Sequence, residues 1–143
     1  MRHRDVAYKF TCKRKATGSR MYCEDTEKGF TIFSYGEHFP IARHTSYGYV
    51  FNSDDYSSST ATHKGYVRSA LDGYVINLPN CDETKVAEQL KEDENHVEHA
   101  TKKLSRVRTE NMKNKWVAEI NEAKENIHLI KKYILPKLVM EAL

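Results

Sequence analysis

The sequence predicts an α+β protein in which a small antiparallel sheet with one short helix precedes a helical hairpin. Two observations give this prediction. Eight of the nine tyrosines, all five phenylalanines and all six glycines precede Pro79, a composition typical of strands and turns. No glycine follows Pro79, and Pro136 is the only later proline, as expected of helices. We therefore expect a sheet domain at residues 1–79 and a charged helical arm, an antiparallel coiled coil, at residues 80–143.

Each predicted strand is a short run of β-forming residues bounded by turn signals. The first is expected near the N-terminus, where four residues alternate with polar neighbours: Val6, Tyr8, Phe10 and Cys12. A hairpin tip at Thr17-Gly18-Ser19 leads to the second strand. Further strands are expected at residues 21–24, 30–33, 39–44, 48–51 and 74–78.

The one short helix of the sheet domain is expected just before the last strand. Thr60 suits the N-cap position, and Asp72-Gly73 suits the helix end. Between them, Val67, Ala70 and Leu71 supply the apolar face.

Apolar residues of the arm form two heptad seams. The first contains Leu90, Val97, Ala100, Leu104 and Val107, and the second contains Trp116, Ile120, Ala123, Ile127, Ile130 and Ile134. Leu104 and Ile120 would lie on nearly opposite faces of one continuous helix, at about 100° per residue. A turn near residues 110–113 resolves this conflict by folding the arm into a hairpin. The alternative is one helix of about fifty residues that pairs with a second chain.

The charges of the arm favour the hairpin. Residues 82–98 hold seven acids and two lysines, a net of −5, and residues 101–115 hold six bases and one acid, a net of +5. In a hairpin that turns near Asn111, the acidic segment would face Lys131, Lys132 and Lys137. The basic segment would face Glu119, Glu122 and Glu125. Each exposed pair contributes only about 0.2–1 kcal/mol, but the pattern selects an antiparallel register.

Composition excludes several classes of protein. With 143 residues, 39% hydrophobic and 30% charged, the chain has an ordinary globular profile. No run approaches the roughly 18 apolar residues of a membrane span, and Asp5 and Lys9 interrupt any signal sequence. The three cysteines lack C-x-x-C spacing, which predicts reduced thiols and a cytoplasmic location. A net charge of +3 does not by itself indicate a nucleic-acid partner.

A serine-rich segment contains the residue types of a hydrolase: Asp54, Asp55, Ser57, Ser58, Ser59 and His63. However, the segment has no G-x-S-x-G elbow, and turns and a helix cap explain its polar residues. We therefore predict no catalytic residues. A hydrolase built on His63 is a third hypothesis, which ranks after a protein-binding and a nucleic-acid-binding function.

A metal site is also disfavoured. His96, His99 and Glu92 share a predicted helix, and Glu125 and His128 lie on the other one. A di-iron site needs two Glu-x-x-His units, and only 125–128 has that spacing. Neither a Walker A nor a dinucleotide motif is present. We predict no metal and no cofactor.

Three surfaces are candidates for binding. Tyrosine gives a large amphipathic contact area, which suits protein recognition. The predicted protein interface consists of Tyr47, Tyr49, Asp54, Asp55 and Tyr56. An electrostatic contact on the arm consists of Lys102, Lys103, Arg106 and Arg108. The alternative is a basic hairpin interleaved with aromatic residues, which can bind nucleic acid through Lys13, Arg14, Lys15 and Arg20.

Short motifs between residues 34 and 71 carry a resemblance. They are Ser34-Tyr35-Gly36, Pro40-Ile41-Ala42, Phe51-Asn52, and Tyr56-Ser57 with Thr60 and His63. In these motifs the chain resembles a small uncharacterised domain family that recurs in bacteriophage and plasmid genomes. It departs from the family at Ser59, where a threonine is usual, and at Glu37-His38-Phe39, which looks like an insertion. The resemblance implies a phage-type accessory protein and brings no catalytic residues.

Together these observations predict a non-enzymatic binding protein of a phage or mobile element, acting in the host cytoplasm. Its expected partner is a host protein or ribonucleoprotein complex, such as a CRISPR-type or other nuclease defence complex, which it would inhibit. The alternative is a nucleic-acid-binding accessory protein. No membrane partner is expected, and a homodimer through the arm is left open.

Overall fold

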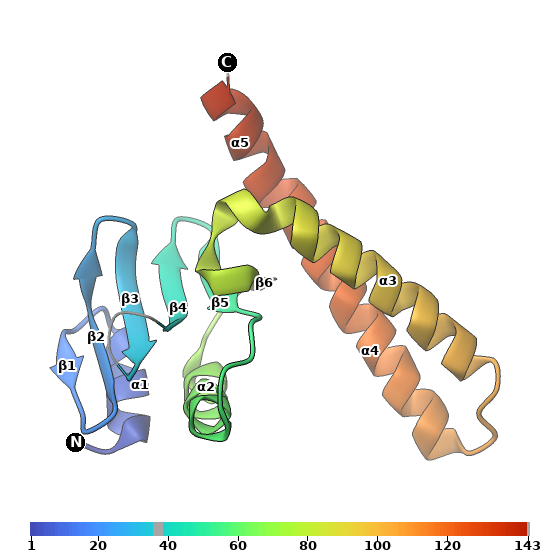
Figure 1. The fold of residues 1–143 in the computed structure, drawn as a ribbon, viewed down its shortest axis with the longest axis horizontal. Coiled ribbons are helices and arrows are strands. Elements are labelled where there is room, and N and C mark those ends of the chain that lie inside the picture. The colour runs from blue at the N-terminus through green and yellow to red at the C-terminus, as the bar shows by residue number, and fades with distance from the viewer. Residues whose placement is uncertain (36–38, 143) are drawn as a thin grey trace. The chain divides into compact units, whose positions relative to one another are not determined.

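Six strands form one sheet in the first half of the chain, and long helices form the second half (Figure 1). The computed structural model describes residues 1–35 and 39–142. It divides into the units Met1–Asp82 and Glu83–Leu143, whereas the predicted boundary was at residue 79. The predicted combination of a sheet with two C-terminal helices is confirmed, but the sheet has six strands and is not the small one expected.

The sheet is a meander whose last strand follows a helical crossover. Its order is β1-β2-β3-β4-β5-β6. The strands are β1 (Ala16–Thr17), β2 (Met21–Thr26), β3 (Gly29–Ser34), β4 (Pro40–Thr45), β5 (Gly48–Asn52) and β6 (Val75–Leu78). Neighbours from β1 to β5 are antiparallel, but β6 is parallel to β5. The expectation of an antiparallel sheet is therefore wrong for this pair, because the helix α2 (Ser58–Ala70) returns the chain to the end where β5 began.

The N-terminal segment is helix α1 (His3–Thr11), where a strand was predicted. Val6, Ala7 and Phe10 are buried and lie on one helical face, whereas Tyr8 is 65% exposed. The sequence of this segment fits both the two-residue period of a strand and the 3.6-residue period of a helix. Packing against the sheet selects the helix. This unit thus has two helices, α1 and α2, rather than one.

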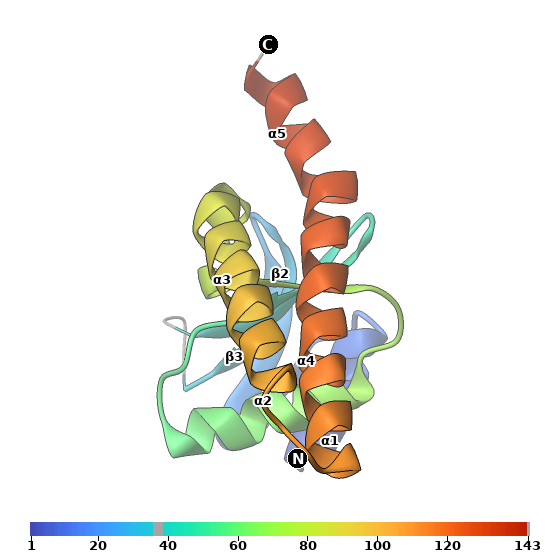
Figure 2. The ribbon, with the colours of Figure 1, turned by 90° about the vertical axis from the view of Figure 1, so that its right-hand side faces the viewer.

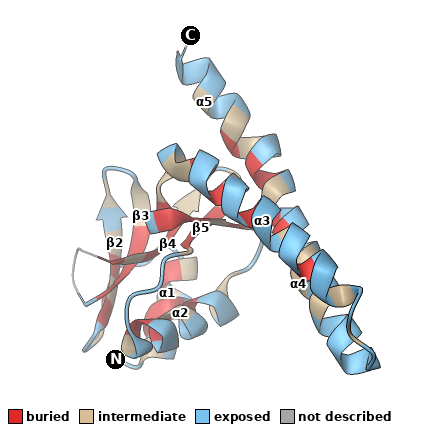
Figure 3. Ribbon diagram, turned by 45° about the vertical axis from the view of Figure 1, so that its right-hand side comes forward, coloured by how far each residue is buried: buried red, intermediate tan, exposed pale blue. Residues whose placement is uncertain are grey.

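Helices α1 and α2 pack on each other and on one face of the sheet. The buried core between these helices and the sheet contains Val6, Phe10, Met21, Ile32, Ile41, Phe51 and Val67. Figure 3 shows the buried segments of the ribbon in red. The N-cap of α2 is Ser57, whose Oγ accepts the Thr60 N–H at 3.2 Å. Thr60 was the predicted cap, but it lies inside the first turn and is fully buried. A 3₁₀ turn, η1 (Pro79–Cys81), follows β6 and packs against β4 and β5.

The second unit is a helical hairpin. It comprises η2 (Glu83–Lys85), α3 (Val86–Leu104), α4 (Glu110–Leu129), the π-helical η3 (Ile130–Ile134) and α5 (Leu135–Ala142). Helices α3 and α4 run side by side in Figures 1 and 2, so the alternative of one continuous helix is wrong. Thr109 caps α4 by accepting the Met112 N–H at 3.3 Å. The turn therefore lies at residues 105–109, earlier than predicted.

A buried polar cluster joins the two helices. Asp93 occupies the first seam at the step between Leu90 and Val97. The Asn126 amide donates to Asp93 Oδ2 and the Gln89 amide donates to Asp93 Oδ1, both at 2.8 Å. All three side chains are buried, and burial raises the pKa of Asp93. Because a polar group at a seam position needs its partner, this cluster specifies the register of the hairpin.

The register corrects the predicted charge pairing. His96 lies 3.7 Å from Glu119, and the His99 ring meets the Trp116 ring with centroids 6.0 Å apart. Continued along the helices, this register places Lys103 level with Met112. The expected pairing of the basic segment with Glu119, Glu122 and Glu125 is therefore wrong, because the turn comes earlier than predicted. At the other end, Lys137 does pair with an acid of the first segment, Glu83, at 3.2 Å.

We predict that Asp93→Asn stabilises the arm at neutral pH and not in acid. The pKa of Asp93 is higher in the folded arm than in the unfolded chain, where it is about 3.9. Its contribution to stability is therefore full below the unfolded pKa and is lost as the pH rises through the folded pKa. Urea unfolding followed by circular dichroism should show a variant advantage that grows from pH 4 to pH 7.5. The matched control is Glu94→Gln, an exposed acid next in the chain. An equal advantage of Asp93→Asn at both pH values would contradict the prediction.

Candidate functional site

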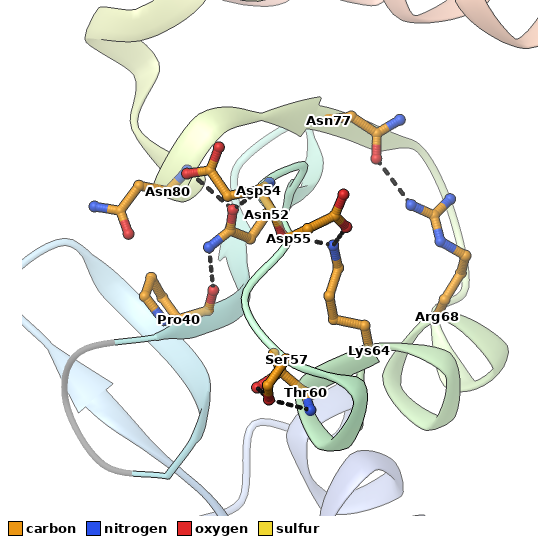
Figure 4. A network of polar contacts seen from close by, with 10 residues as sticks. All are labelled: Pro40, Asn52, Asp54, Asp55, Ser57, Thr60, Lys64, Arg68, Asn77 and Asn80. Carbon is orange, nitrogen blue, oxygen red and sulfur yellow. Dashed lines mark hydrogen bonds and ion pairs between the residues drawn. The ribbon is translucent and has the colours of Figure 1, made fainter. Parts of the chain in front are cut away.

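The carboxyl ends of the parallel strands β5 and β6 are joined by one buried side chain, Asn52, which is 1% exposed (Figure 4). Its Oδ1 accepts the backbone N–H groups of Asp54 at 2.8 Å and Asn80 at 3.0 Å. Its Nδ2 donates to the Pro40 carbonyl at 2.8 Å. This carboxamide therefore fixes the start of the β5–α2 loop, the η1 turn and the start of β4. In α/β sheets, ligands commonly bind at the carboxyl ends of parallel strands.

Residues 53–57 form the β5–α2 loop, which is also held in its middle and at its end. Lys64 Nζ donates to the Asp54 carbonyl at 2.9 Å and lies 4.0 Å from the Asp55 carboxylate. Ser57 caps α2. The loop displays three members of the predicted interface, Asp54, Asp55 and Tyr56, and Tyr56 is 75% exposed. A loop with fixed backbone loses little entropy on binding, which suits a recognition surface.

The other two members of the predicted interface lie elsewhere. Tyr49 is 4% exposed, and its hydroxyl donates to Asp72 at 2.5 Å. Burial and this bond raise its pKa. Tyr49 faces the core because it shares a face of β5 with Phe51, so its assignment to the interface is wrong. Tyr47 is half-buried before the other end of β5, about 20 Å along the strand from the β5–α2 loop.

The serine-rich segment does not assemble a catalytic set with His63. His63 Nδ1 instead lies 2.6 Å from Ser34 Oγ at the end of β3. Both residues are at most 2% exposed, and burial lowers the pKa of His63. Ser57 caps α2, and the Ser59 hydroxyl bonds to Tyr35. The partner of His63 is thus the buried Ser34, which the sequence pattern around His63 did not indicate.

The four basic residues of the predicted nucleic-acid site separate into two groups. Lys13, Arg14 and Lys15 lie between the end of α1 and β1. Arg20 lies at the β1–β2 turn, where Gly18 packs against Val6 near the start of α1. The two groups thus lie near opposite ends of α1, whose nine residues span about 13 Å. The four basic residues therefore do not form one cluster at a basic hairpin.

Basic side chains gather at the end of the hairpin, where the predicted electrostatic contact lies. We call this cluster the arm tip: Lys102, Lys103, Arg106, Arg108, Lys113 and Lys115. All six are exposed. Glu110 is the one acid among residues 101–115.

Neither a metal centre nor a membrane span is seen in the described part of the chain. In residues 1–35 and 39–142, no three His, Cys, Asp or Glu side chains are arranged to hold a metal ion. Within the same residues, no helix combines the length and the apolar character needed to cross a membrane. All three cysteines are free thiols, and burial raises the pKa of Cys23 to about 11 and of Cys81 to about 12.

Comparison of the chain with models of protein families, with curated proteins and with solved structures finds no match. Two features of the family resemblance reach undescribed residues. Gly36 of the Ser34-Tyr35-Gly36 motif and Glu37 and His38 of the expected insertion at Glu37-His38-Phe39 lie outside the described residues.

We predict that Asn52→Ala loosens the β5–α2 loop and destabilises the sheet unit. The change removes three part-buried hydrogen bonds, to the Asp54 and Asn80 N–H groups and to the Pro40 carbonyl, a loss on the order of 3 kcal/mol. Denaturant unfolding should show the loss, and amide exchange at Asp54 and Asn80 should accelerate. Asp54→Ala is the control, because the Asp54 bond to Asn52 uses backbone and survives it. Equal stability of the two variants would contradict the role of Asn52.

A second prediction concerns the loss of stability of the sheet unit at acidic pH. The folded pKa values of His63 and His44 are lowered, chiefly by burial. Their contributions to stability are therefore full above the unfolded pKa of about 6.5 and are lost as the pH falls through the folded values. The double variant Ser34→Ala, His63→Phe should lose less unfolding free energy between pH 7.5 and 5.5 than the wild type. The loss that comes from protonation of His44 is present in both proteins. Equal losses would show that His63 is not buried as a neutral group.

Proposed function

We propose that this protein is a non-enzymatic binding protein that engages a polyanionic partner through the arm tip. The register of the hairpin is the observation that carries the proposal. It sets Lys103 level with Met112, so the basic segment does not lie against Glu119, Glu122 and Glu125. In the described residues, the one salt bridge from the arm tip is Lys102 to Glu98 at 3.3 Å, within the same helix.

An unbalanced group of exposed bases at the end of two packed helices supports contact with phosphates or with an acidic protein surface. Arginine and lysine at such a site attract a polyanion over several ångströms and accelerate its association. Nucleic acid is the polyanion that best matches a dense cluster of this kind.

The setting follows from the resemblance of residues 34–71 to a phage and plasmid family. On that basis the partner is a host ribonucleoprotein or nuclease defence complex, of the CRISPR type among others, and the protein acts as its inhibitor. The β5–α2 loop then supplies a protein contact through Asp54, Asp55 and Tyr56. Inhibition by occupation needs complementary surfaces only, and the buried Ser34–His63 pair is consistent with a protein that performs no hydrolysis.

The test is the salt dependence of binding to mixed-sequence single- and double-stranded nucleic acid. We expect K102Q/K103Q/R106Q/R108Q to weaken binding and to reduce the slope of log K against log salt by about 3 to 4 for duplex. The matched control, K91Q/K124Q/K131Q/K132Q, removes four exposed charges from the same arm and should change both quantities far less. Equal effects of the two variants would contradict a localised contact at the arm tip.

A further inference from the structure

A row of four rings crosses the sheet unit where α1, α2 and the end of β3 meet. The Tyr66 and His3 rings are 5.7 Å apart, and the His3 and His63 rings are 4.5 Å apart. Tyr35 continues the row, 5.4 Å from His63. His63 is buried, whereas Tyr66 and Tyr35 are 39% and 47% exposed. The row thus offers two exposed tyrosine rings, with the partly exposed imidazole of His3 and the buried imidazole of His63 between them.

Arginines lie at both ends of this row. Arg20 Nη1 donates to the Tyr35 hydroxyl at 3.1 Å, and its guanidinium lies 5.8 Å from the centre of that ring. At the other end is a groove of about 580 Å³, lined by Met1, Arg2, His3, Arg4, Asp5, Ser19 and Tyr66. Arg2 and Arg4 are exposed, and Asp5 is the only acid in the lining. We call this groove, together with Tyr35 and Arg20, the ring groove.

We propose that the ring groove binds a phosphate with its attached aromatic base, as presented by single-stranded nucleic acid. Arg2 and Arg4 contact the phosphate, and the base stacks on Tyr66. The guanidinium fork matches phosphate oxygens, and tyrosine stacks on any base without reading its sequence. A second base is positioned to meet Tyr35 and Arg20 at the far end of the row.

The dimensions favour a single strand over a duplex or a folded protein. The groove has the volume of a small-molecule site, which suits one nucleotide. Bases in a duplex are stacked on each other and offer no free face to a tyrosine ring, whereas unpaired bases do. The ring groove belongs entirely to residues 1–82, so it stands independently of the arm tip.

The experiment uses the full chain with the arm tip neutralised by K102Q/K103Q/R106Q/R108Q, so that the arm contact cannot supply the signal. Fluorescein-labelled oligothymidylate is titrated and followed by anisotropy. In this background R2A/R4A should weaken binding about tenfold or more, whereas R14A/K15A, which removes two charges at the other end of α1, should change it by less than about twofold. Tyr66→Leu should weaken binding about fivefold or more and leave the salt slope unchanged.

Competition then identifies the ligand. Thymidine monophosphate should displace the oligomer far better than inorganic phosphate does. If the mononucleotide displaces the oligomer at concentrations similar to those at which the unlabelled oligomer does, the site is assigned to free nucleotides of the same chemistry. Equal competition by inorganic phosphate would overturn the stacking role of Tyr66. Absence of oligothymidylate binding, or an R14A/K15A loss equal to that of R2A/R4A in folded variants, would overturn the site itself.

Discussion

The hydrogen bond between Asp93 and Asn126 is the constraint on which the functional surface of the arm depends. Apolar seams tolerate a slip of one turn, because leucine, isoleucine and valine can pack against several neighbours. A buried carboxylate does not, since a slip separates it from the amides of Asn126 and Gln89 and leaves it buried without partners. The register that results decides which charges face each other. It pairs Glu83 with Lys137 near one end and leaves the bases of the arm tip facing solvent at the other.

Buried polar groups have the same role in the sheet unit. Asn52 holds the β5–α2 loop, and through the Asn80 N–H it also holds a turn in which Asn80 and Cys81 have φ of 53° and 52°. Such left-handed residues persist only where the surroundings fix them. The Ser34–His63 pair likewise supports the ring row, because the buried imidazole lies between His3 and Tyr35. In both units, satisfied polar atoms inside the fold determine which side chains are displayed outside it.

The sequence predicted those elements whose periodicity had only one interpretation. Strands from β2 to β6 and the two arm helices were found, because alternation, turn residues and heptads agree there. Helix α1 was missed since Val6 and Phe10 fit both a strand and a helix, and only packing against the sheet decides between them. The parallel pairing of β6 depends on how α2 returns the chain, which local patterns do not encode. At the candidate site, composition predicted Asp54, Asp55 and Tyr56, which the β5–α2 loop does expose, but the burial of Tyr49 and the separation of Arg20 from Lys13 arise from tertiary structure. Asp93 was overlooked because it is a polar residue at a seam position where an apolar residue is expected. An acid at such a position is itself the signal of a buried polar contact between the helices.

The register of the hairpin can be measured directly, by electron–electron distances between spin labels on the arm. One pair is placed at residues 103 and 113 and the other at residues 103 and 119. The structure predicts the shorter distance for 103–113, with 103–119 longer by up to about 9 Å, the rise of six helical residues. A shorter 103–119 distance would place the basic segment against Glu119, restore its intramolecular partners and contradict the exposed arm tip on which the proposed function depends.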